Sequence, residues 1–275
     1  MQTQGSIGIF DSGYGGLTIL KEIVSLLPQY NYTYLGDNAR SPYGNRSFET
    51  VHQYTQDCVA WFFSKGCHLV ILACNTASAK ALRTIQQQYL PTLNQQNKRV
   101  LGVIRPTAEV IGNYTSTNHI GVLATNGTIQ SNSYLIEIQK LFPNITVHQQ
   151  ACPMWVPLIE NNEHNHKGAN YFVKEYIDAL DKQHPNIDTI LLGCTHYPLL
   201  LNKIKEYTPI GTKIITQGEI VAHSLQDYLA RNTAIAALCS KGNTREFYTT
   251  DSVEDFNKNA TIFYGEAIES KLAKV

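Results

Sequence analysis

Two short segments of nearly the same pattern constrain the fold of this chain more than any other feature. Ile71 to Ser78 reads I-L-A-C-N-T-A-S, and Leu191 to Pro198 reads L-L-G-C-T-H-Y-P. In both, apolar residues run into a small residue, a cysteine and a polar residue, which is typical of a buried strand that ends in a polar turn. Ligands of open α/β sheets bind at the carboxyl ends of strands, so Cys74 and Cys194 are candidates to meet in one site.

Strand and helix patterns alternate through the first part of the chain. An apolar run at 7–10 ends in the turn D-S-G-Y-G-G, and apolar residues at helical spacing follow until Pro28. A second strand at 32–36 leads to a loop, where Ser47 can cap a helix. The strand at Leu69 and a helix from about Ala77 complete the unit. This order predicts a parallel sheet covered by helices on both faces.

The pattern then restarts, which suggests an internal repeat. The polar stretch N-Q-Q-N-K-R at 94–99 predicts a linker, and H-I-G-V-L-A-T-N-G at His119 echoes S-I-G-I-F-D-S-G at Ser6. Chance similarity of two short strands is the alternative. The turn cluster Y-T-P-I-G-T-K at Tyr207 predicts a return to the first lobe. We therefore expect an α/β fold of two pseudo-symmetric lobes, residues 1–98 plus 210–275 and residues 99–209, with the active site in the cleft between them.

Composition narrows the class of partner. The 275 residues are 43% apolar, which is enough for a substantial core, and 22 Lys and Arg balance 22 Asp and Glu. A neutral chain predicts a small-molecule partner rather than nucleic acid or an anionic membrane. The longest apolar stretch, 69–74, is far below the roughly 20 residues of a spanning helix, and the N-terminus lacks the pattern of a signal peptide. These features predict a soluble, cytoplasmic protein.

The six cysteines are expected to be reduced, because a chain of this length without an export signal rarely carries a disulfide framework. No C-x-x-C occurs, and neither strand-end cysteine has a second cysteine at metal-ligand spacing, so we expect no zinc site. Cys58, Cys67, Cys152 and Cys239 lack the paired context, and we expect inert, packed or surface thiols there.

Cys74 and Cys194 can act as bases. A thiol that precedes a helix feels the positive end of the helix dipole, which predicts a lowered pKa and more thiolate at neutral pH. Simple burial is the alternative for either thiol alone, but it does not explain a matched pair. Two thiols on opposite faces of one carbon can invert a stereocentre without a cofactor, because one removes a proton while the other supplies one.

Four further groups accompany the thiols in the sequence. Asp11 or Ser12 either caps a helix, or the two bind an ammonium group or polarise a thiol. His196 is either an acid-base partner of Cys194 or a structural histidine. Glu160 has apolar neighbours and is either desolvated or an ordinary acid at a helix end. His164 and His166 form an H-x-H pair that we interpret as solvated surface.

Together, the motifs D-S-G-Y-G-G, S-P-Y-G, A-C-N-T-A-S, T-N-G-T, A-C-P-M-W-V-P-L-I-E and G-C-T-H-Y-P resemble those of glutamate racemases, in the aspartate/glutamate racemase family. The resemblance runs from the first strand past Gln217. It implies cofactor-independent interconversion of L- and D-glutamate, without metal, pyridoxal phosphate or nicotinamide, in a bacterial cytoplasm, with the product used for peptidoglycan synthesis.

The resemblance also implies roles for individual residues. Cys74 and Cys194 match the proton donor-acceptors, and Asp11, Glu160 and His196 match residues that assist them. Ligand-binding positions are matched by Asp11, Ser12, Tyr43, Gly44, Asn75, Thr76, Thr195 and His196, and Thr125 and Thr128 match positions near the substrate carboxylates. Q-G-E at Gln217 departs from the acidic or serine-containing stretch of many relatives. The N-terminus lacks the extension of members activated by a cell-wall precursor, so we expect activity without an activator.

Three other readings stay open at this point. Aspartate racemases share the two-cysteine plan, but their second motif usually continues T-E rather than T-H-Y-P. A thiol hydrolase that uses Cys194 and His196 leaves the twin Cys74 motif unexplained. A two-lobed small-molecule binding protein needs neither cysteine. A homodimer is compatible with all of these, because a dimer patch looks like core in a sequence.

Overall fold

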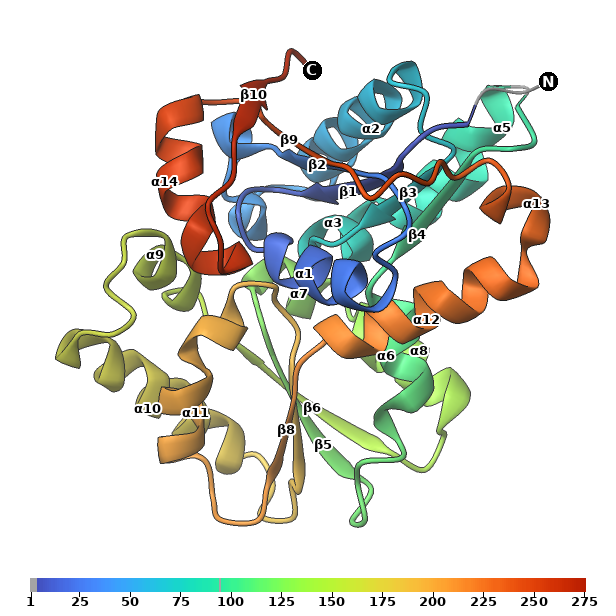
Figure 1. Cartoon of the computed structure of the whole chain (residues 1–275). Helices are drawn as coiled ribbons and strands as arrows, with labels where there is room; N and C mark the ends of the chain where they lie inside the picture. Colours follow the sequence, from blue (N-terminus) through green and yellow to red (C-terminus); the bar gives the residue numbers. More distant parts are fainter. Residues whose placement is uncertain (1–3, 94) are drawn as a thin grey trace.

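The computed structural model describes residues 4–93 and 95–275, and within them the chain forms two lobes, each built on a parallel sheet (Figure 1). The six-stranded sheet of the first lobe consists of β1 (Ile7–Asp11), β2 (Tyr32–Gly36), β3 (Leu69–Leu72), β4 (Arg99–Gly102), β9 (Arg245–Thr249) and β10 (Ser270–Leu272). The four-stranded sheet of the second lobe consists of β5 (His119–Ala124), β6 (Thr146–Ala151), β7 (Thr189–Leu192) and β8 (Lys213–Ile215).

Helices follow most of the strands. Those of the first lobe are α1 (Leu17–Leu26), α2 (Phe48–Ser64), α3 (Asn75–Lys80), α4 (Leu82–Thr84), α5 (Leu90–Thr92), α13 (Thr233–Ala236) and α14 (Val253–Tyr264). Those of the second lobe are α6 (Ile104–Ile111), α7 (Asn126–Gln130), α8 (Ser133–Leu141), α9 (Trp155–Glu160), α10 (Lys167–Asp181) and α11 (Leu201–Tyr207). α12 (Gly218–Arg231) leads back to the first lobe and packs on α1 and α6.

The strand order of the two sheets reveals the repeat. The order β2-β1-β3-β4 of the first sheet is matched by β6-β5-β7-β8 in the second, and β9 and β10 extend the first sheet beyond β2. The two segments that echo each other in the sequence thus occupy equivalent strands, β1 and β5. Cys74 and Cys194 follow the equivalent strands β3 and β7.

Two strands lie on the other side of the expected lobe boundaries. β4 pairs with β3 in the first sheet, although residues from 99 onward were expected in the second lobe. β8 pairs with β7 in the second sheet, although residues from 210 onward were expected in the first. The described residues of these stretches before the strands, 95–98 and 208–212, form turns that lead into β4 and β8 rather than crossings between the lobes. Asn94, the first residue of the expected linker, lies outside the described residues.

Both faces of each sheet are covered, as the continuous apolar strands predict. On one face of β1, Ile7 and Ile9 belong to the cluster that contains α1, α12 and α14 residues, while Phe10 belongs to the cluster of α2 residues. In the second sheet, Val122 packs with α6 and α8, and Leu123 packs toward α9 and α10. The predicted helix cap is also present, since the Ser47 side chain caps α2 by accepting a hydrogen bond from the Thr50 N–H.

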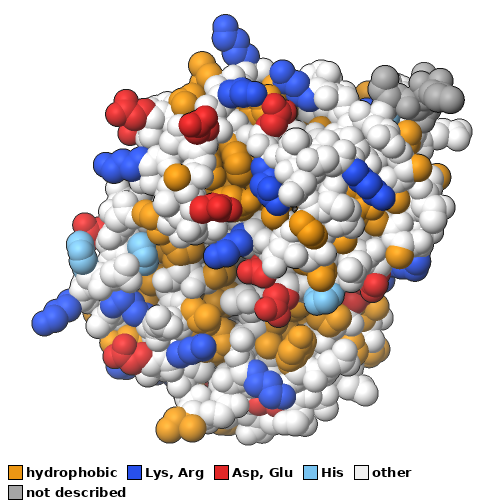
Figure 2. All heavy atoms as spheres, viewed as in Figure 1, with side chains coloured by type: hydrophobic (Ala, Val, Ile, Leu, Met, Phe, Trp, Pro, Cys, Tyr) orange, Lys and Arg blue, Asp and Glu red, His pale blue; other side chains and the backbone are white. Residues whose placement is uncertain are grey.

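The surface carries charged side chains of both signs, interspersed over the face that Figure 2 shows. None of the helices in residues 4–93 and 95–275 combines the length and the apolarity that a membrane crossing requires.

Candidate active site

Cys74 and Cys194 line one cavity at the carboxyl ends of β3 and β7, as the sequence pattern predicts. The cavity has a volume of about 50 Å³, which is room for a few water molecules. Both lobes contribute to its wall, which consists of Ser12, Ser41, Pro42, Tyr43, Gly44, Asn45, Cys74, Asn75, Thr76, Thr125, Asn126, Pro153, Val156, Pro157, Glu160, Cys194, Thr195 and His196.

Cys74 is the residue before α3, and its sulfur accepts a hydrogen bond from the Ala77 N–H at 3.5 Å. The Sγ donates toward the Ser12 hydroxyl, also at 3.5 Å. Burial and the nearby Asp11 carboxyl raise the pKa of Cys74 to about 12. The prediction of a lowered pKa is therefore wrong for this thiol, because loss of solvent and a neighbouring acid outweigh the single N–H at the start of a short helix.

Cys194 is placed differently, beside a histidine rather than a serine. Its Sγ lies 3.9 Å from the Nδ1 atom of His196, and the Nε2 atom of His196 lies 3.0 Å from the Glu160 carboxylate. Burial favours the neutral imidazole, but the contacts with Cys194 and Glu160 raise the pKa of His196 well above its usual value. His196 therefore lies where it can exchange a proton with the sulfur, with Glu160 holding the ring in place.

Asp11 connects the two lobes rather than capping a helix. Its carboxylate accepts a hydrogen bond from the Gly13 N–H at 2.9 Å and a long one from the Thr195 hydroxyl at 3.4 Å. α1 begins after Gly16, where no side chain caps it. Burial raises the pKa of Asp11, and the nearby His196 opposes this shift. The capping alternative for Asp11 is therefore wrong.

The glycine-rich turn lets the lobes approach each other. A Cβ atom at Gly15 would lie 2.3 Å from the Thr195 hydroxyl and 2.4 Å from the Nδ1 atom of His196. These contacts are far closer than van der Waals distance, so only glycine leaves room for the Cys194 loop.

Hydroxyl and amide groups line the other side of the cavity. The Thr76 hydroxyl lies 3.0 Å from that of Thr125, and Thr128 lies behind both, within 3.4 Å of Thr76 and 3.2 Å of Thr125. Of the ligand-binding residues predicted from the sequence, Asp11 and Thr128 are fully buried behind the cavity wall and the others form it. Tyr43 lines the wall with its hydroxyl donated to Asp37.

Gln217, whose role the sequence left open, is buried in a network that joins the lobes. Its side-chain carbonyl accepts a hydrogen bond from Asn75 at 2.7 Å, and its amide donates to the hydroxyls of Tyr134 at 2.7 Å and Thr107 at 2.8 Å. Tyr134 in turn donates to the Asn75 carbonyl at 2.5 Å. Gln217 therefore fixes the side chain next to Cys74.

Sequence reasoning missed several residues of the wall. Ser41 and Pro42 are part of the S-P-Y-G motif, and Pro153, Val156 and Pro157 are part of the motif that contains Glu160, so the motifs indicated these residues although no role was assigned to them.

The prediction of a solvated His164 is wrong, because this side chain is buried with its Nδ1 atom unpaired, whereas His166 is exposed and paired with Glu163 at 2.5 Å.

The remaining cysteines are free and buried, as predicted for inert thiols. Burial raises the pKa of each of them, which keeps them protonated at neutral pH: Cys58, Cys67, Cys152 and Cys239.

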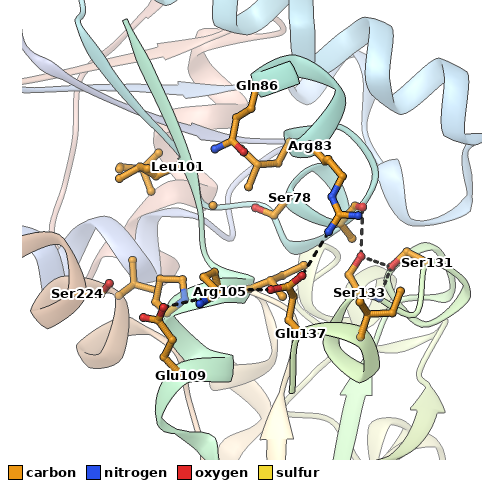
Figure 3. Close-up of a pocket in the computed structure, with 18 of the residues that line it drawn as sticks. Ser78, Arg83, Gln86, Leu101, Arg105, Glu109, Ser131, Ser133, Glu137 and Ser224 are labelled. Carbon is orange, nitrogen blue, oxygen red and sulfur yellow. Dashed lines mark hydrogen bonds and ion pairs between the residues drawn. The ribbon is translucent and has the colours of Figure 1, made fainter. Parts of the chain in front are cut away.

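A second cavity, of about 660 Å³, lies elsewhere between the lobes, where α4, α6, α8 and α12 meet. Figure 3 shows Glu137 of α8 reaching both Arg83 of α4 and Arg105 of α6 at its rim, with distances of 3.4 and 3.2 Å. Neither of the two thiols is among the residues that line it, so it is separate from the cavity of Cys74 and Cys194.

Comparison with known proteins identifies relatives along nearly the whole chain. A glutamate racemase of Persephonella marina is 45% identical over 264 residues, which cover 96% of this chain and 95% of that protein. A glutamate racemase of Sulfurihydrogenibium sp. is 38% identical over 267 residues, which cover 97% and 96%.

Solved structures give the same result. A glutamate racemase isoform of Bacillus anthracis matches with a TM-score of 0.88 at 34% identity, and 98% of each chain is covered. The glutamate racemase of Francisella tularensis in complex with D-glutamate matches with a TM-score of 0.86 at 31% identity, again with 98% of each chain covered. Residues 7–225 match the family described as Asp/Glu/hydantoin racemase. The chain therefore belongs to the Asp/Glu/hydantoin racemase family, a family of isomerases.

Proposed function

We propose that this protein interconverts L- and D-glutamate without a cofactor, with Cys74 and Cys194 as the two bases. The observation that carries the proposal is that two thiols, placed by equivalent strands of the two lobes, line the same cavity. A hydrolase would use one thiol and its histidine, and would leave the second thiol without a role.

The chemistry is a proton exchange at Cα. One cysteine, as a thiolate, takes the α-proton, and the electron pair of the broken C–H bond is held by the carboxyl group of the carbanionic intermediate. The other cysteine, as a thiol, delivers its S–H proton to the opposite face. The stereocentre is inverted and the two sulfurs have exchanged protonation states. We assign Cys74 to proton removal from D-glutamate and Cys194 to proton removal from L-glutamate.

The neighbours of the thiols support these roles. His196, held by Glu160, can return or accept the proton of Cys194. The Cys74 thiol, whose pKa is raised to about 12 by burial and Asp11, needs a positive charge to ionise at neutral pH. The ammonium group of the bound amino acid supplies that charge when it enters the cavity.

The cavity also suits a substrate with two carboxylates. None of the described residues in its wall is Lys or Arg, so carboxylates would be bound by neutral donors, among them Asn75, Thr76 and Thr125. A volume of about 50 Å³ is too small for glutamate, so the lobes must separate to admit it and close around it. Closure excludes water and strengthens every electrostatic contact with the reacting carbon.

We further propose a cytoplasmic enzyme that supplies D-glutamate for peptidoglycan synthesis.

The test is to replace each thiol by an alcohol. Cys74→Ser and Cys194→Ser should each reduce the rate of racemisation by about 10²–10⁴-fold, because an alcohol is too weak an acid to supply the base at neutral pH. The rate is measured by the change of circular dichroism of L- and of D-glutamate. Cys152→Ser, a buried cysteine outside the cavity wall, is the control.

The alternatives give different results. A binding protein would bind glutamate and racemise nothing in the wild type. An aspartate racemase would turn over aspartate faster than glutamate. Near wild-type turnover by either serine variant would exclude the two-thiol mechanism.

A further inference from the structure

Three histidines gather at the end of the second sheet that is remote from the thiols. His119 is the first residue of β5, His148 lies in β6, and His184 lies in the loop between α10 and β7. The sequence gives no sign of this cluster, because 29 residues separate His119 from His148 and the third histidine comes from a loop. Parallel pairing of the strands brings them together.

The packing of α10 on the sheet explains why His184 lies beside His119. His148 pairs with Gly121 in the register of β5 and β6, so the strand residue beside it has no side chain. A Cβ atom at Gly121 would lie 2.5 Å from the side chain of Leu180, near the end of α10. The glycine therefore lets α10 approach the sheet, and the loop after the helix places His184 over His119.

The three rings are close enough to share one ion. The candidate ligand atoms of His119, His148 and His184 all lie within 4.8 Å of one another. The Nδ1 atom of His119 is 3.1 Å from the Nε2 atom of His148, and the rings of His119 and His184 stack with their centroids 3.7 Å apart. All three side chains are half-buried, so an ion can reach them from solvent.

The distance between His119 and His148 fits tetrahedral coordination by imidazole. Zinc binds histidine nitrogen at about 2.0–2.1 Å, which separates two ligand nitrogens by roughly 3.3 Å. The pair His119 and His148 already has about this separation. Stacked rings aim their lone pairs in parallel, so the ring of His184 must rotate out of the stack to point at the same ion.

We propose that His119, His148 and His184 form a binding site for one divalent transition-metal ion such as Zn²⁺, Co²⁺ or Ni²⁺. Imidazole suits these metals, and three protein ligands leave a fourth position for water. The ion would join the start of β5, β6 and the loop before β7, and would thus stabilise the second lobe. His119 and Ala124 lie at opposite ends of β5, about 17 Å apart at the rise of a strand, so the ion takes no part in proton transfer.

The experiment uses the full chain after treatment with a chelator and dialysis. Titration with Co²⁺ should give the visible absorption of a tetrahedral site at one equivalent, and Zn²⁺ at about 100 times its Kd should raise the Tm by about 5 °C or more. Racemisation should be unchanged by the chelator, because the site is remote from the thiols.

Two variants test the ligands. His184→Ala and His119→Phe should each weaken metal binding by at least about tenfold and abolish the metal-dependent rise in Tm. His119→Phe keeps an aromatic ring against His184, so its metal-free Tm shows whether the fold is intact. His223→Ala, at an exposed histidine of α12, should bind metal like the wild type.

Three results would overturn the proposal. The first is a wild-type protein that binds none of the three metals below about 100 µM. The second is a His184→Ala or His119→Phe variant that binds them as tightly as the wild type. The third is binding by the wild type that abolishes racemisation in proportion to the metal bound, which would place the ion at the thiols instead.

Discussion

The two thiols occupy equivalent positions but have different neighbours, and this asymmetry decides what single substitutions should do. Cys74 faces Ser12 and the buried Asp11, whereas Cys194 faces His196, which Glu160 holds. In the proposed mechanism, loss of a neighbour should affect mainly the proton transfer of its own sulfur. The symmetry of the reaction nevertheless limits how that loss can appear in the kinetics.

His196→Asn tests the partner of Cys194. Enantiomers have equal free energy, so the equilibrium constant is one and kcat/KM must fall by the same factor in both directions. We expect a fall of about 100-fold, because an acid-base partner is lost, with unequal changes of the two kcat values. Full kinetics from L- and from D-glutamate measure both quantities.

His166→Asn, at an exposed histidine, is the control for this experiment. An unchanged kcat/KM in His196→Asn would make His196 a structural residue. Clearly unequal values in the two directions would mean that the reaction is not a simple racemisation.

At the scale of elements, α12 matters because it carries Gln217 at its start into contact with both lobes. Gln217→Leu should leave the buried Asn75 amide without its acceptor, at a cost of about 1–3 kcal/mol. The Tyr134 and Thr107 hydroxyls would lose a donor but would still donate to Asn75 and Val103. We expect a lower urea midpoint and also a lower kcat, because Asn75 is the first residue of α3 and directly follows Cys74.

Gln226→Leu, at an exposed position of the same helix, should change neither quantity. A Gln217→Leu variant that is destabilised but has the wild-type kcat would confine Gln217 to a structural role.

The elements also show how far sequence reasoning reaches. Strands β1, β3, β5 and β7 could be predicted because their apolar runs end in glycine or cysteine motifs. β4 and β8 could not be assigned to a sheet, because R-V-L-G and K-I-I are short and follow polar turns that look like linkers. The sheet that such a short strand joins depends on how the helices around it pack, which the local sequence does not encode.

The same limit applies to the site. Its two thiols were predictable because each motif places one at a strand end. The pKa of Cys74 was not, since it depends on burial and on the Asp11 carboxyl, which lies far away in the sequence but on the neighbouring strand β1. The contacts of Gln217 were equally hidden, because they join residues far apart in the chain.

For the molecule as a whole, buried thiols predict a loss of stability in alkali. The folded state holds their protons to higher pH than the unfolded chain, whose thiols ionise near pH 8.5. Burial raises the pKa of Cys58, Cys67, Cys74, Cys152 and Cys239, to about 12 for Cys74 and Cys239. The stability that they contribute is therefore present below about pH 8.5 and is lost as pH rises toward 12.

The free energy of unfolding, measured by urea denaturation, should therefore fall between about pH 8.5 and about pH 10.5, by on the order of 1–3 kcal/mol for each fully buried thiol, and the urea midpoint should fall with it. Cys239→Ala should reduce this dependence on pH, because it removes one of the titrating groups. A midpoint that stays constant over this range would contradict the raised pKa values.

Because the two lobes repeat one strand order, each presents its cysteine at the same place, and the central claim is that the two sulfurs act on opposite faces of one carbon. The most direct test is solvent deuterium uptake at Cα at low conversion, starting from each enantiomer of glutamate in D₂O. The account predicts that nearly every product molecule carries one deuterium, since the second thiol has exchanged with solvent, while recovered substrate keeps its protium. Product that retains the α-proton of the substrate would mean that a single base carries it across, and would contradict the two-cysteine mechanism.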